Sequence, residues 1–375
     1  MTSSQHPSVR MRIAYLPGDG VGPEVGAEAL RALDAVGRRF GHNFDVEEAS
    51  IGGAAIDAWG DPLPPATREV AEQADAVLLG AVGGPQWSDP AAAVRPEQGL
   101  LELRRLLGTY ANVRPLQLFD AGRAISPLRP ERLDGVDFVV VRELTGGLYY
   151  GQKHRDRAPD GRELAWDVCT YSAMEIERVV RVAAQLARAR RGRLTSVDKA
   201  NVLETSRLWR DVTTRIVRDE YPDVVLDHVL VDACAMFLIR EPARFDVIVT
   251  ENLFGDILTD EASVIAGSIG LLPSASLGAE RSGVARRAGL YEPIHGSAPD
   301  IAGQGRANPV GMILSVAMML RASFELETEA RSIEDAVRST LDDGFRTPDV
   351  ALPGERASRT DEFGREVARR ISQLH

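Results

Sequence analysis

The sequence is short of cysteine, and its two cysteines lie far apart. Cys169 and Cys234 stand outside any CxxC pair. Structural zinc sites and disulfide frameworks need several closely spaced cysteines. The cysteine content therefore predicts neither, and it is typical of a protein of the reducing cytoplasm.

Positive charge is also in deficit. Lys and Arg number 44 against 55 Asp and Glu, which gives a formal net charge of −11. Binding to nucleic acid or to an anionic membrane surface through a broad basic face needs the opposite balance. We therefore expect no nucleic-acid partner, whereas a small anionic substrate is compatible with arginines that gather locally.

Long apolar runs are missing as well. The longest charge-free stretch, residues 262–279, contains four Ser, three Gly and a Pro, and the first ten residues are polar. A membrane span needs about 20 apolar residues, and a secretory signal needs an apolar core near the N-terminus. The sequence thus predicts no membrane association and no secretory signal.

What the chain does contain is an alternation of apolar runs and helix-length segments. Its 375 residues are enough for two domains. Predicted strands at 11–16, 44–50, 74–82, 137–141, 193–198, 224–231 and 245–250 alternate with predicted helices at 24–40, 172–191, 206–220 and from 256. Such alternation predicts an α/β protein with a largely parallel sheet. Residues 150–168 interrupt it with a polar stretch and a PDG turn signal, which predicts a projecting hairpin arm.

Four of the predicted strands run directly into charged residues. The strand DFVVV leads to Arg142, RLTSVD to Lys199, VVLDHVLV to Asp232, and FDVIVT to Glu251 and then Asp256. Ligands of open α/β sheets bind beyond the carboxyl ends of the strands. One such charge would be an ordinary solvated loop residue, but four in successive strands favour a single site.

Two carboxylates in FGDILTDE are spaced for one face of a helix. Asp256 and Asp260 are four residues apart, so they would lie on neighbouring turns. Together with Asp232 they form an all-oxygen set that suits Mg²⁺ or Mn²⁺. A negative N-terminal turn favoured by the helix dipole explains the pair equally well, and the spacing leaves both interpretations open.

The first glycine-rich segment, LPGDGVGPEV, follows a predicted strand. A dinucleotide-binding GxGxxG motif would need glycine at position 23, where Pro23 stands. The segment is therefore not a Rossmann match. A tight strand-to-helix turn and a direct ligand contact are both compatible with it.

Two further segments are candidates for binding an anionic ligand. In GLLELRRLLGTYANVRP, Leu100 and Arg104 lie one helical turn apart and Arg114 follows. A plain amphipathic helix explains this pattern, but with Arg142 these residues would also suit a ligand with carboxylates and a branched hydrocarbon group. The long loop at 291–309 is of a kind that is often functional, and its amides could bind phosphate.

Taken together, these strings resemble the β-decarboxylating dehydrogenases, the isocitrate/isopropylmalate dehydrogenase family. The resemblance runs from Met11 to about Phe324 through nine ordered strings: PGDGVGPEV, GAVGGPQW, EQGLLELR, YANVRP, VRELTGGLYYG, SVDKANVLE, TENLFGDILTDEAS, GLLPSASLG and EPIHGSAPDIAG. It implies a fold of class α/β, a two-domain open sheet of this family's type that is not a Rossmann fold, with a projecting β arm. The implied domains are a cofactor-side domain of residues 1–109 and 267–375, and a substrate, metal and dimerisation domain of residues 110–266 with its arm at about 150–168.

The resemblance also implies a role for each matching site residue. The catalytic residues would be Tyr149 and Lys199, the latter as general base. The substrate would be bound by Arg104, Arg114, Arg142, Asp232, Leu100, Leu101 and Val202, and the metal by Asp232, Asp256 and Asp260. The cofactor would be bound by Gly83, Gly84, Glu97, His295, Gly296, Ser297, Ala298, Asp300 and Asn308.

The implied reaction is the NAD-dependent, Mg²⁺- or Mn²⁺-dependent oxidative decarboxylation of (2R,3S)-3-isopropylmalate in leucine biosynthesis. The family further implies a homodimer in which Lys199 and Asp232 act in the partner's site. Alternatives are another 3-alkylmalate, homoisocitrate or tartrate as substrate, or a non-catalytic paralogue subunit. The intact Tyr149, Lys199 and metal aspartates argue against the paralogue. Gln86 departs from the lysine frequent at its position, and the arm sequence is idiosyncratic.

Overall fold

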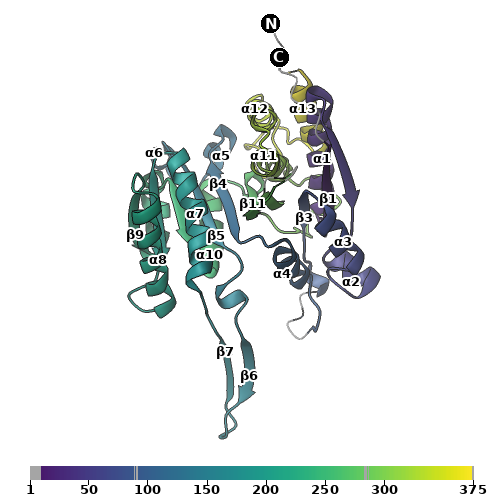
Figure 1. Ribbon diagram of the computed structural model, residues 1–375. Helices are drawn as coiled ribbons and strands as arrows, with labels where there is room; N and C mark the ends of the chain where they lie inside the picture. Colours follow the sequence, from purple (N-terminus) through teal and green to yellow (C-terminus); the bar gives the residue numbers. More distant parts are fainter. Residues whose placement is uncertain (1–9, 88, 90–91, 283–284, 286, 374–375) are drawn as a thin grey trace. The chain divides into compact units, whose positions relative to one another are not determined.

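The computed structural model describes residues 10–87, 89, 92–282, 285 and 287–373 (Figure 1). The chain packs as two compact units. The first unit comprises Met1–Thr109, Leu118–Pro127 and Ala266–His375, and the second comprises Tyr110–Gln117 and Leu128–Ile265. The short segment Leu118–Pro127 packs with the first unit because Gly122 lies directly against the carbonyl oxygen of Ala266, which leaves no space for a side chain.

The strands of the first unit are mostly parallel. Their order is β2-β1-β3-β12-β11, with an antiparallel pairing only between β11 and β12. The strands are β1 (Arg10–Gly18), β2 (Asn43–Glu48), β3 (Ala76–Ala81), β11 (Pro273–Glu280) and β12 (Arg287–Pro293). The helices are α1 (Gly22–Phe40), α2 (Gly53–Trp59), α3 (Pro65–Gln73), α4 (Pro96–Leu107), α5 (Asp120–Ile125), α11 (Val310–Phe324), α12 (Glu327–Asp342) and α13 (Thr360–Gln373).

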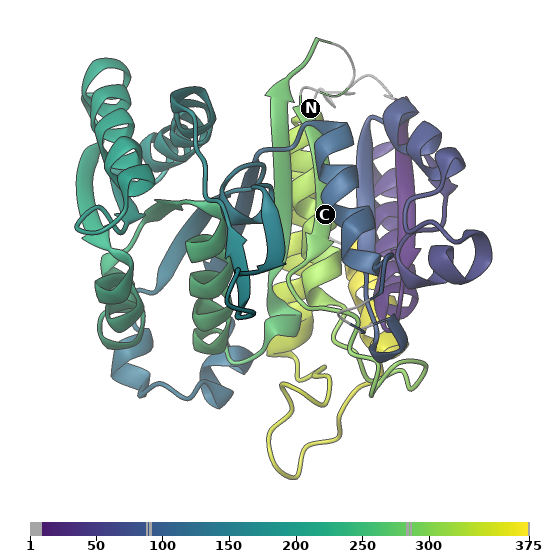
Figure 2. The ribbon, with the colours of Figure 1, turned by 90° about the horizontal axis from the view of Figure 1, so that it is seen from below.

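Buried aliphatic residues of the first unit's strands build its core. Leu16, Leu79 and Leu290 from three neighbouring strands belong to one cluster, to which α4 adds Leu103. The C-terminal helices α11 to α13 lie beside α1 in the same unit, as their yellow-green and yellow ribbons show in Figures 1 and 2. Strands buried on both faces read as continuous apolar runs, which explains why the sequence located β1 and β3. The antiparallel pair β11 and β12 was not predicted.

The second unit follows the same plan. Its strand order is β4-β5-β10-β8-β9, parallel except for the antiparallel pairing of β4 with β5. The strands are β4 (Ala111–Gln117), β5 (Asp137–Glu143), β8 (Arg193–Asp198), β9 (Val225–Leu230) and β10 (Val247–Thr250). The helices are α6 (Pro130–Leu133), α7 (Ala173–Ala189), α8 (Glu204–Glu220), α9 (Val231–Arg240) and α10 (Asn252–Ile265).

Two helix starts in the second unit differ from the sequence expectation. The helix expected from Asp256 begins four residues earlier, at Asn252, so Asp256 lies in its second turn. The strand expected to run into Asp232 ends at Leu230, and Asp232 lies in the first turn of α9. Apolar residues continue through the junction before α9, and three polar residues, Thr250 to Asn252, separate β10 from the body of α10, so hydrophobicity alone does not mark where the helix starts in either case.

The predicted hairpin arm is present. The strands β6 (Lys153–Arg157) and β7 (Glu163–Asp167) pair antiparallel and extend from the body of the second unit (Figure 1). One face of the hairpin carries Leu164, Trp166 and Val168, all exposed. Over the ranges that the structure describes, no helix combines the length and apolarity that crossing a membrane requires.

Candidate active site

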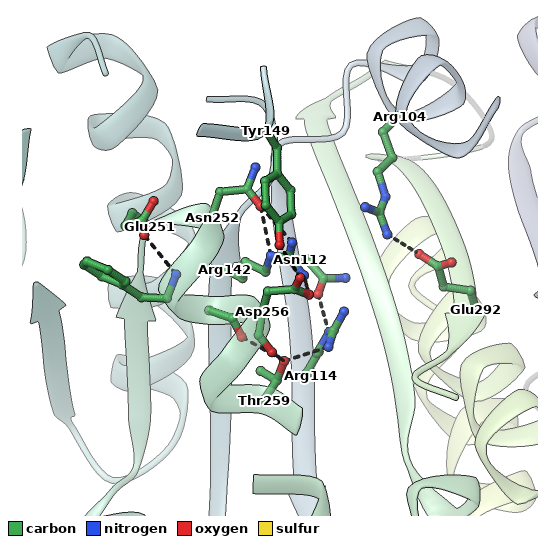
Figure 3. Close-up of polar contacts among 12 residues, drawn as sticks. Arg104, Asn112, Arg114, Arg142, Tyr149, Glu251, Asn252, Asp256, Thr259 and Glu292 are labelled. Atoms are coloured by element: carbon green, nitrogen blue, oxygen red, sulfur yellow. Dashed lines mark hydrogen bonds and ion pairs between the residues drawn. The ribbon is translucent and has the colours of Figure 1, made fainter. Parts of the chain in front are cut away.

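A buried arginine near the carboxyl end of β5 is the centre of the second unit's polar cluster. Arg142, only 2% exposed, donates from Nε and Nη2 to the amide oxygen of Asn252 at 3.0 and 2.8 Å. Its Nη1 pairs with the Asp256 carboxylate (Figure 3). A helix at this position presents residues 252 and 256 on one face, so α10 supplies both partners.

The phenol of Tyr149 contacts the same carboxylate. Tyr149 lies in the 3₁₀ turn η2 (Gly147–Tyr149) and donates to Asp256 Oδ2 at 2.5 Å. Burial, and then the hydrogen bond to Asp256, raises the pKa of Tyr149 to about 12. Burial opposes the charge of Asp256, but Arg142 and Tyr149 outweigh it and lower the pKa of that carboxyl group. The arrangement keeps a protonated phenol beside an ionised carboxylate at neutral pH.

A second arginine of the cluster donates to two neutral side chains. Arg114, in β4, donates from Nε to the Asn112 side chain at 2.7 Å and from Nη1 to the Thr259 hydroxyl at 2.6 Å (Figure 3). Both partners are buried. Hydrogen bonds to neutral acceptors orient a guanidinium, and the positive charge of Arg114 also acts on the carboxyl groups of Asp256 and Asp260, where it favours the ionised form.

The three predicted metal aspartates do not come together within one chain. Asp256 and Asp260 lie one turn apart on α10, whereas Asp232 accepts a 2.6 Å hydrogen bond from the amine of Lys199, which lowers the pKa of Asp232. In the described part of the chain, no three acidic, His or Cys residues are grouped as a metal site would require. Lys199 and Asp232 therefore form a pair of their own, at the ends of β8 and β9.

The third predicted arginine belongs to the first unit. Arg104, on α4, donates from Nη2 to Glu292 at 2.9 Å, with both side chains largely buried. Among the residues that the structure describes, its buried Nε has no hydrogen-bond partner. The guanidinium of Arg104 is thus fixed by Glu292, and its Nε still lacks an acceptor. Buried donors of this kind normally have a hydrogen-bond partner.

The residues expected to form an apolar wall are found in two places. Leu100 and Leu101 are half-buried on α4, where Leu100 packs against the core of the first unit. Val202 follows Lys199 in the second unit and is 62% exposed. Leu100 and Arg104 share a face of α4, so an aliphatic surface lies beside a guanidinium as the sequence indicated.

The glycine-rich string GAVGGPQW is packed tightly in the first unit. A side chain at Gly83 would meet the carboxylate of Glu97, and one at Gly84 would meet the ring of Trp87. Asp19 fixes this region, because its carboxylate accepts the amide of Gly83 at 2.7 Å. Gly83 and Glu97, both predicted to bind cofactor, are therefore brought together.

The long loop after β12 carries an unsatisfied histidine nitrogen. His295 Nδ1 lies 2.8 Å from the carbonyl of Gly296, which can only accept, so Nδ1 carries the proton and Nε2 is an acceptor. The residue is partly exposed, but its Nε2 is buried and has no partner within the described ranges. Burial lowers the pKa of His295. The neutral ring thus presents an unused acceptor.

The first glycine-rich turn supports this loop. Val21 donates its amide to the carbonyl of Ser297 at 2.8 Å, and Gly20 has φ +58°. A β-carbon on Gly20 would lie 1.9 Å from the Ser297 carbonyl oxygen. The turn is thus explained by its close approach to the loop. Ala298 has the unusual φ of +37°, which marks a constrained backbone.

The other loop residues predicted to bind cofactor differ in their surroundings. Asp300 and Gly296 are exposed. Asn308 is buried, donates to Asp349 at 2.9 Å and accepts the amide of Val310 at 3.1 Å, so it anchors the loop to α11. The exposed members are open to a ligand, whereas Asn308 is buried and fixes the loop through these two hydrogen bonds.

Sequence reasoning missed several residues that orient this site. Asn252, Asn112 and Thr259 hold two of the arginines, and Glu292 pairs with the third. Their signal was weak because each is a single side chain with no periodic pattern of its own. Asn252 and Thr259 did stand in the string TENLFGDILTDEAS, at spacings from Asp256 that a helix places on neighbouring positions.

The chain belongs to the isocitrate/isopropylmalate dehydrogenase family, whose pattern it matches over residues 12–367. The predicted family is therefore confirmed. Among solved structures it is similar to an isocitrate dehydrogenase from Methylococcus capsulatus, with a TM-score of 0.83 and 36% identity over 97% of this chain and 100% of that one.

Two curated relatives carry a more specific name. A 3-isopropylmalate dehydrogenase from Geobacillus kaustophilus is 56% identical over 95% of this chain and 94% of its own length. One from Moorella thermoacetica is 55% identical over 96% of this chain and 99% of its own length. Similarity thus extends over essentially the whole of both relatives.

Proposed function

We propose that the protein oxidatively decarboxylates (2R,3S)-3-isopropylmalate to 4-methyl-2-oxopentanoate, in leucine biosynthesis, with NAD as hydride acceptor. The observation that carries the proposal is the convergence of Arg142 and Tyr149 on the Asp256 carboxylate. It joins a carboxylate-binding cation, a proton donor and a metal-ligating oxygen. The names of the relatives supply the substrate.

The proton transfers fall to two side chains of this chain. Lys199 accepts the proton of the substrate's 2-hydroxyl as hydride leaves the same carbon. After CO₂ is lost, Tyr149 gives its phenolic proton to the enolate carbon, and the raised pKa of Tyr149 keeps that proton in place at neutral pH. Arg104, Arg114 and Arg142 hold the substrate carboxylates, which fixes the reactive geometry.

A divalent cation fits the acidic residues of α10. Although the Asp260 side chain is exposed, partial desolvation and then the charge of Asp256 raise its pKa. In the described structure Asp260 makes no hydrogen bond or ion pair through its carboxylate. Two hard oxygen donors one turn apart suit Mg²⁺ or Mn²⁺, which would polarise the substrate's hydroxyl and later its carbonyl oxygen as a Lewis acid.

A dinucleotide fits the loop of the first unit. The unused acceptor Nε2 of His295 and the exposed backbone at Gly296 offer contacts to an amino group, a hydroxyl or a phosphate. We assign cofactor binding to Gly83, Gly84, Glu97, His295, Gly296, Ser297, Ala298, Asp300 and Asn308. NAD would accept the hydride from the substrate.

We further propose a homodimer in which Lys199 and Asp232 complete the partner's site. This accounts for their separation from Asp256 and Asp260 as a distinct pair. Exposed apolar side chains on the adjacent helices α9 and α10, among them Met236 and Ile257, offer an interface. Both cysteines are free, which supports a reducing compartment, and we place the enzyme in the cytoplasm.

The direct test is NADH formation, followed by its absorbance, with isopropylmalate, NAD and Mn²⁺. We expect turnover together with stoichiometric 4-methyl-2-oxopentanoate and CO₂. Tyr149→Phe is the matched control, because it removes the proposed proton donor and keeps the ring. Absence of NADH with isopropylmalate, but turnover of isocitrate, homoisocitrate or tartrate, would replace the proposed substrate within the same family.

A further inference from the structure

A buried tyrosine that the sequence did not assign to the site contacts the polar cluster around Arg142 through Asn252. Tyr171 precedes α7 and is 7% exposed. Its hydroxyl donates to the Glu251 carboxylate at 3.1 Å and accepts the backbone amide of Asn252 at 3.0 Å. The ring packs edge-on against Trp209, with centroids 5.8 Å apart. One hydroxyl thus satisfies the first amide of α10, which no residue of the helix can pair.

The same ring supports the turn that carries the phenol of Tyr149. A β-carbon at Gly146 would lie 2.5 Å from Cε1 of Tyr171, and one at Gly147 would lie 2.4 Å from its hydroxyl oxygen. The backbone of this turn therefore rests directly on the ring. The Asn252 side chain also donates to the carbonyl of Gly146 at 3.1 Å, which ties the turn to α10 a second time.

We propose that Tyr171 is a positioning residue that holds the Gly146–Tyr149 turn and the start of α10 in fixed register, and so sets Tyr149 against Asp256. The inference rests on the proposed function for its catalytic consequence. Among the described residues, no hydrogen bond or ring contact joins Tyr171 to Tyr149 or Asp256, so it acts through the two backbones. Small displacements of a reacting group are costly, since about 1 Å can lower turnover about 100-fold.

The side chain of Asn252 extends the same register to the substrate-binding side. The side-chain oxygen of Asn252 accepts from Nε and Nη2 of Arg142, and the backbone N–H of Asn252 donates to the Tyr171 hydroxyl. Loss of that hydroxyl leaves a buried N–H without an acceptor at the first residue of α10. An unmade hydrogen bond of this kind is relieved by movement of the helix start, which carries Asn252 and Asp256 with it and disturbs their contacts with Arg142 in β5.

Tyr171→Phe is the discriminating variant, because it removes the hydroxyl and keeps the ring under Gly146 and Gly147. The matched control is Tyr291→Phe in the first unit, which removes a buried tyrosine hydroxyl hydrogen-bonded to Ser323 at 2.6 Å. We expect Tyr171→Phe to lower kcat about tenfold with the KM for NAD unchanged. Tyr291→Phe should leave kcat within about twofold.

A double-mutant cycle separates positioning from a general loss of stability. In a Tyr149→Phe background, Tyr171→Phe should lower the residual kcat by a clearly smaller factor than it does in the wild-type background, because the part of its effect that passes through the phenol is missing. Equal fractional losses in both backgrounds would overturn the proposal. Glu251→Gln, which keeps an acceptor for the tyrosine hydroxyl, should lower kcat less than Tyr171→Phe does.

A measurement independent of turnover decides the structural part. Amide hydrogen exchange should accelerate in both Gly146–Tyr149 and Asn252–Asp256 of Tyr171→Phe, and in neither segment of Tyr291→Phe. Unchanged exchange in the two segments, or a rise spread over the whole chain, would contradict the proposal. If the wild-type protein turns over none of the substrates, the proposed function fails, and the exchange data still decide the role of Tyr171.

Discussion

The phenol of Tyr149 and the carboxylate of Asp256 are joined by a 2.5 Å hydrogen bond, although 107 residues separate them in the sequence. The tyrosine comes from a short turn after β5, and the aspartate comes from the second turn of α10. The bond links a group assigned to proton transfer with one assigned to metal binding. The titration of either residue therefore reports on the other.

We predict that Asp256→Asn lowers the pKa of Tyr149 from about 12. Because burial is the larger cause, the pKa should stay above its ordinary value. Folding favours the neutral phenol, so its contribution to stability is present below about pH 10 and is lost as pH rises through about 12. Phenolate absorbance during an alkaline titration with chelator, minus that of a Tyr149→Phe counterpart, gives the midpoint. An unchanged midpoint would show that the carboxylate does not influence the phenol.

Removal of divalent metal should abolish turnover. Asp256 and Asp260 repel each other one turn apart, and a cation offsets that repulsion. Activity should disappear after exhaustive chelation and return with Mn²⁺, and Asp260→Asn should raise the half-saturating Mn²⁺ concentration about tenfold or more. Asp211→Asn, at an exposed position of α8, is the control. Full activity in the chelated enzyme would remove the metal from the mechanism.

Two inactive variants should restore each other's activity in a mixed dimer. Lys199→Ala damages the residue proposed to act in the partner's site, whereas Tyr149→Phe damages the residue that acts with its own Asp256. A heterodimer of the two would contain one site with both residues intact. After subunit exchange, each heterodimer should have about half of the activity of a wild-type dimer, because one of its two sites is intact. No recovery, with exchange confirmed by mass, would place both residues in the same subunit's site.

NAD should be preferred over NADP by at least about tenfold in kcat/KM. The exposed carboxylate of Asp300 can accept a hydrogen bond from a ribose hydroxyl, but it repels a 2′-phosphate. Asp300→Asn should weaken the preference by improving NADP use. The control is Asp34→Asn on α1, which neutralises an exposed carboxylate elsewhere in the same unit. Equal efficiency of the wild-type enzyme with both cofactors would refute the role of Asp300.

The aliphatic face of α4 should exclude isocitrate. Leu100 and Leu101 cannot pair the additional carboxylate of isocitrate, and an unpaired buried charge costs several kcal/mol. Leu100→Ser should lower kcat/KM for isopropylmalate, and ethyl- or tert-butyl-malate should still react because one methylene is worth only about 1–3 kcal/mol. Steady-state kinetics with NAD and Mn²⁺ provide the comparison. A preference of the wild-type enzyme for isocitrate would overturn the substrate assignment.

Most strands and the hairpin arm could be predicted from the sequence because their signals are local, whereas β4, β11 and β12 were missed. Continuous apolar runs such as DFVVV mark buried parallel strands, and the PDG turn marks the arm. The start of α10 could not be placed, since Thr250, Asn252 and Leu253 fit a strand end and a helix start equally well. Hydrogen bonds of side chains to the backbone, which settle the boundary, leave no periodic pattern.

The hydrogen-bond partners of the charged residues could not be predicted from the sequence, for a different reason. Arg104 was assigned to substrate from its spacing on a helix, but its contact with Glu292 joins residues 188 positions apart. Tyr171 resembled an ordinary core aromatic, and only the fold brings its hydroxyl to the first amide of α10. Sequence motifs identify the reactive side chains. The side chains that orient them come from distant parts of the chain, so only the tertiary structure identifies those.

The helix α10 carries four residues of the site: Asn252, Asp256, Thr259 and Asp260. The first three contact Arg142, Arg114 and the phenol of Tyr149, and Asp260 adds a second carboxylate. Each residue of an α-helix turns the chain by about 100° and advances it by about 1.5 Å. Inserting or deleting a single residue between Asn252 and Asp260 would therefore rotate every later side chain away from its partner at once. Such a segment tolerates change only by substitution. New substrate preferences in this architecture must then arise on separate elements, such as α4 with Leu100 and Leu101, where one side chain can change without moving the chemistry.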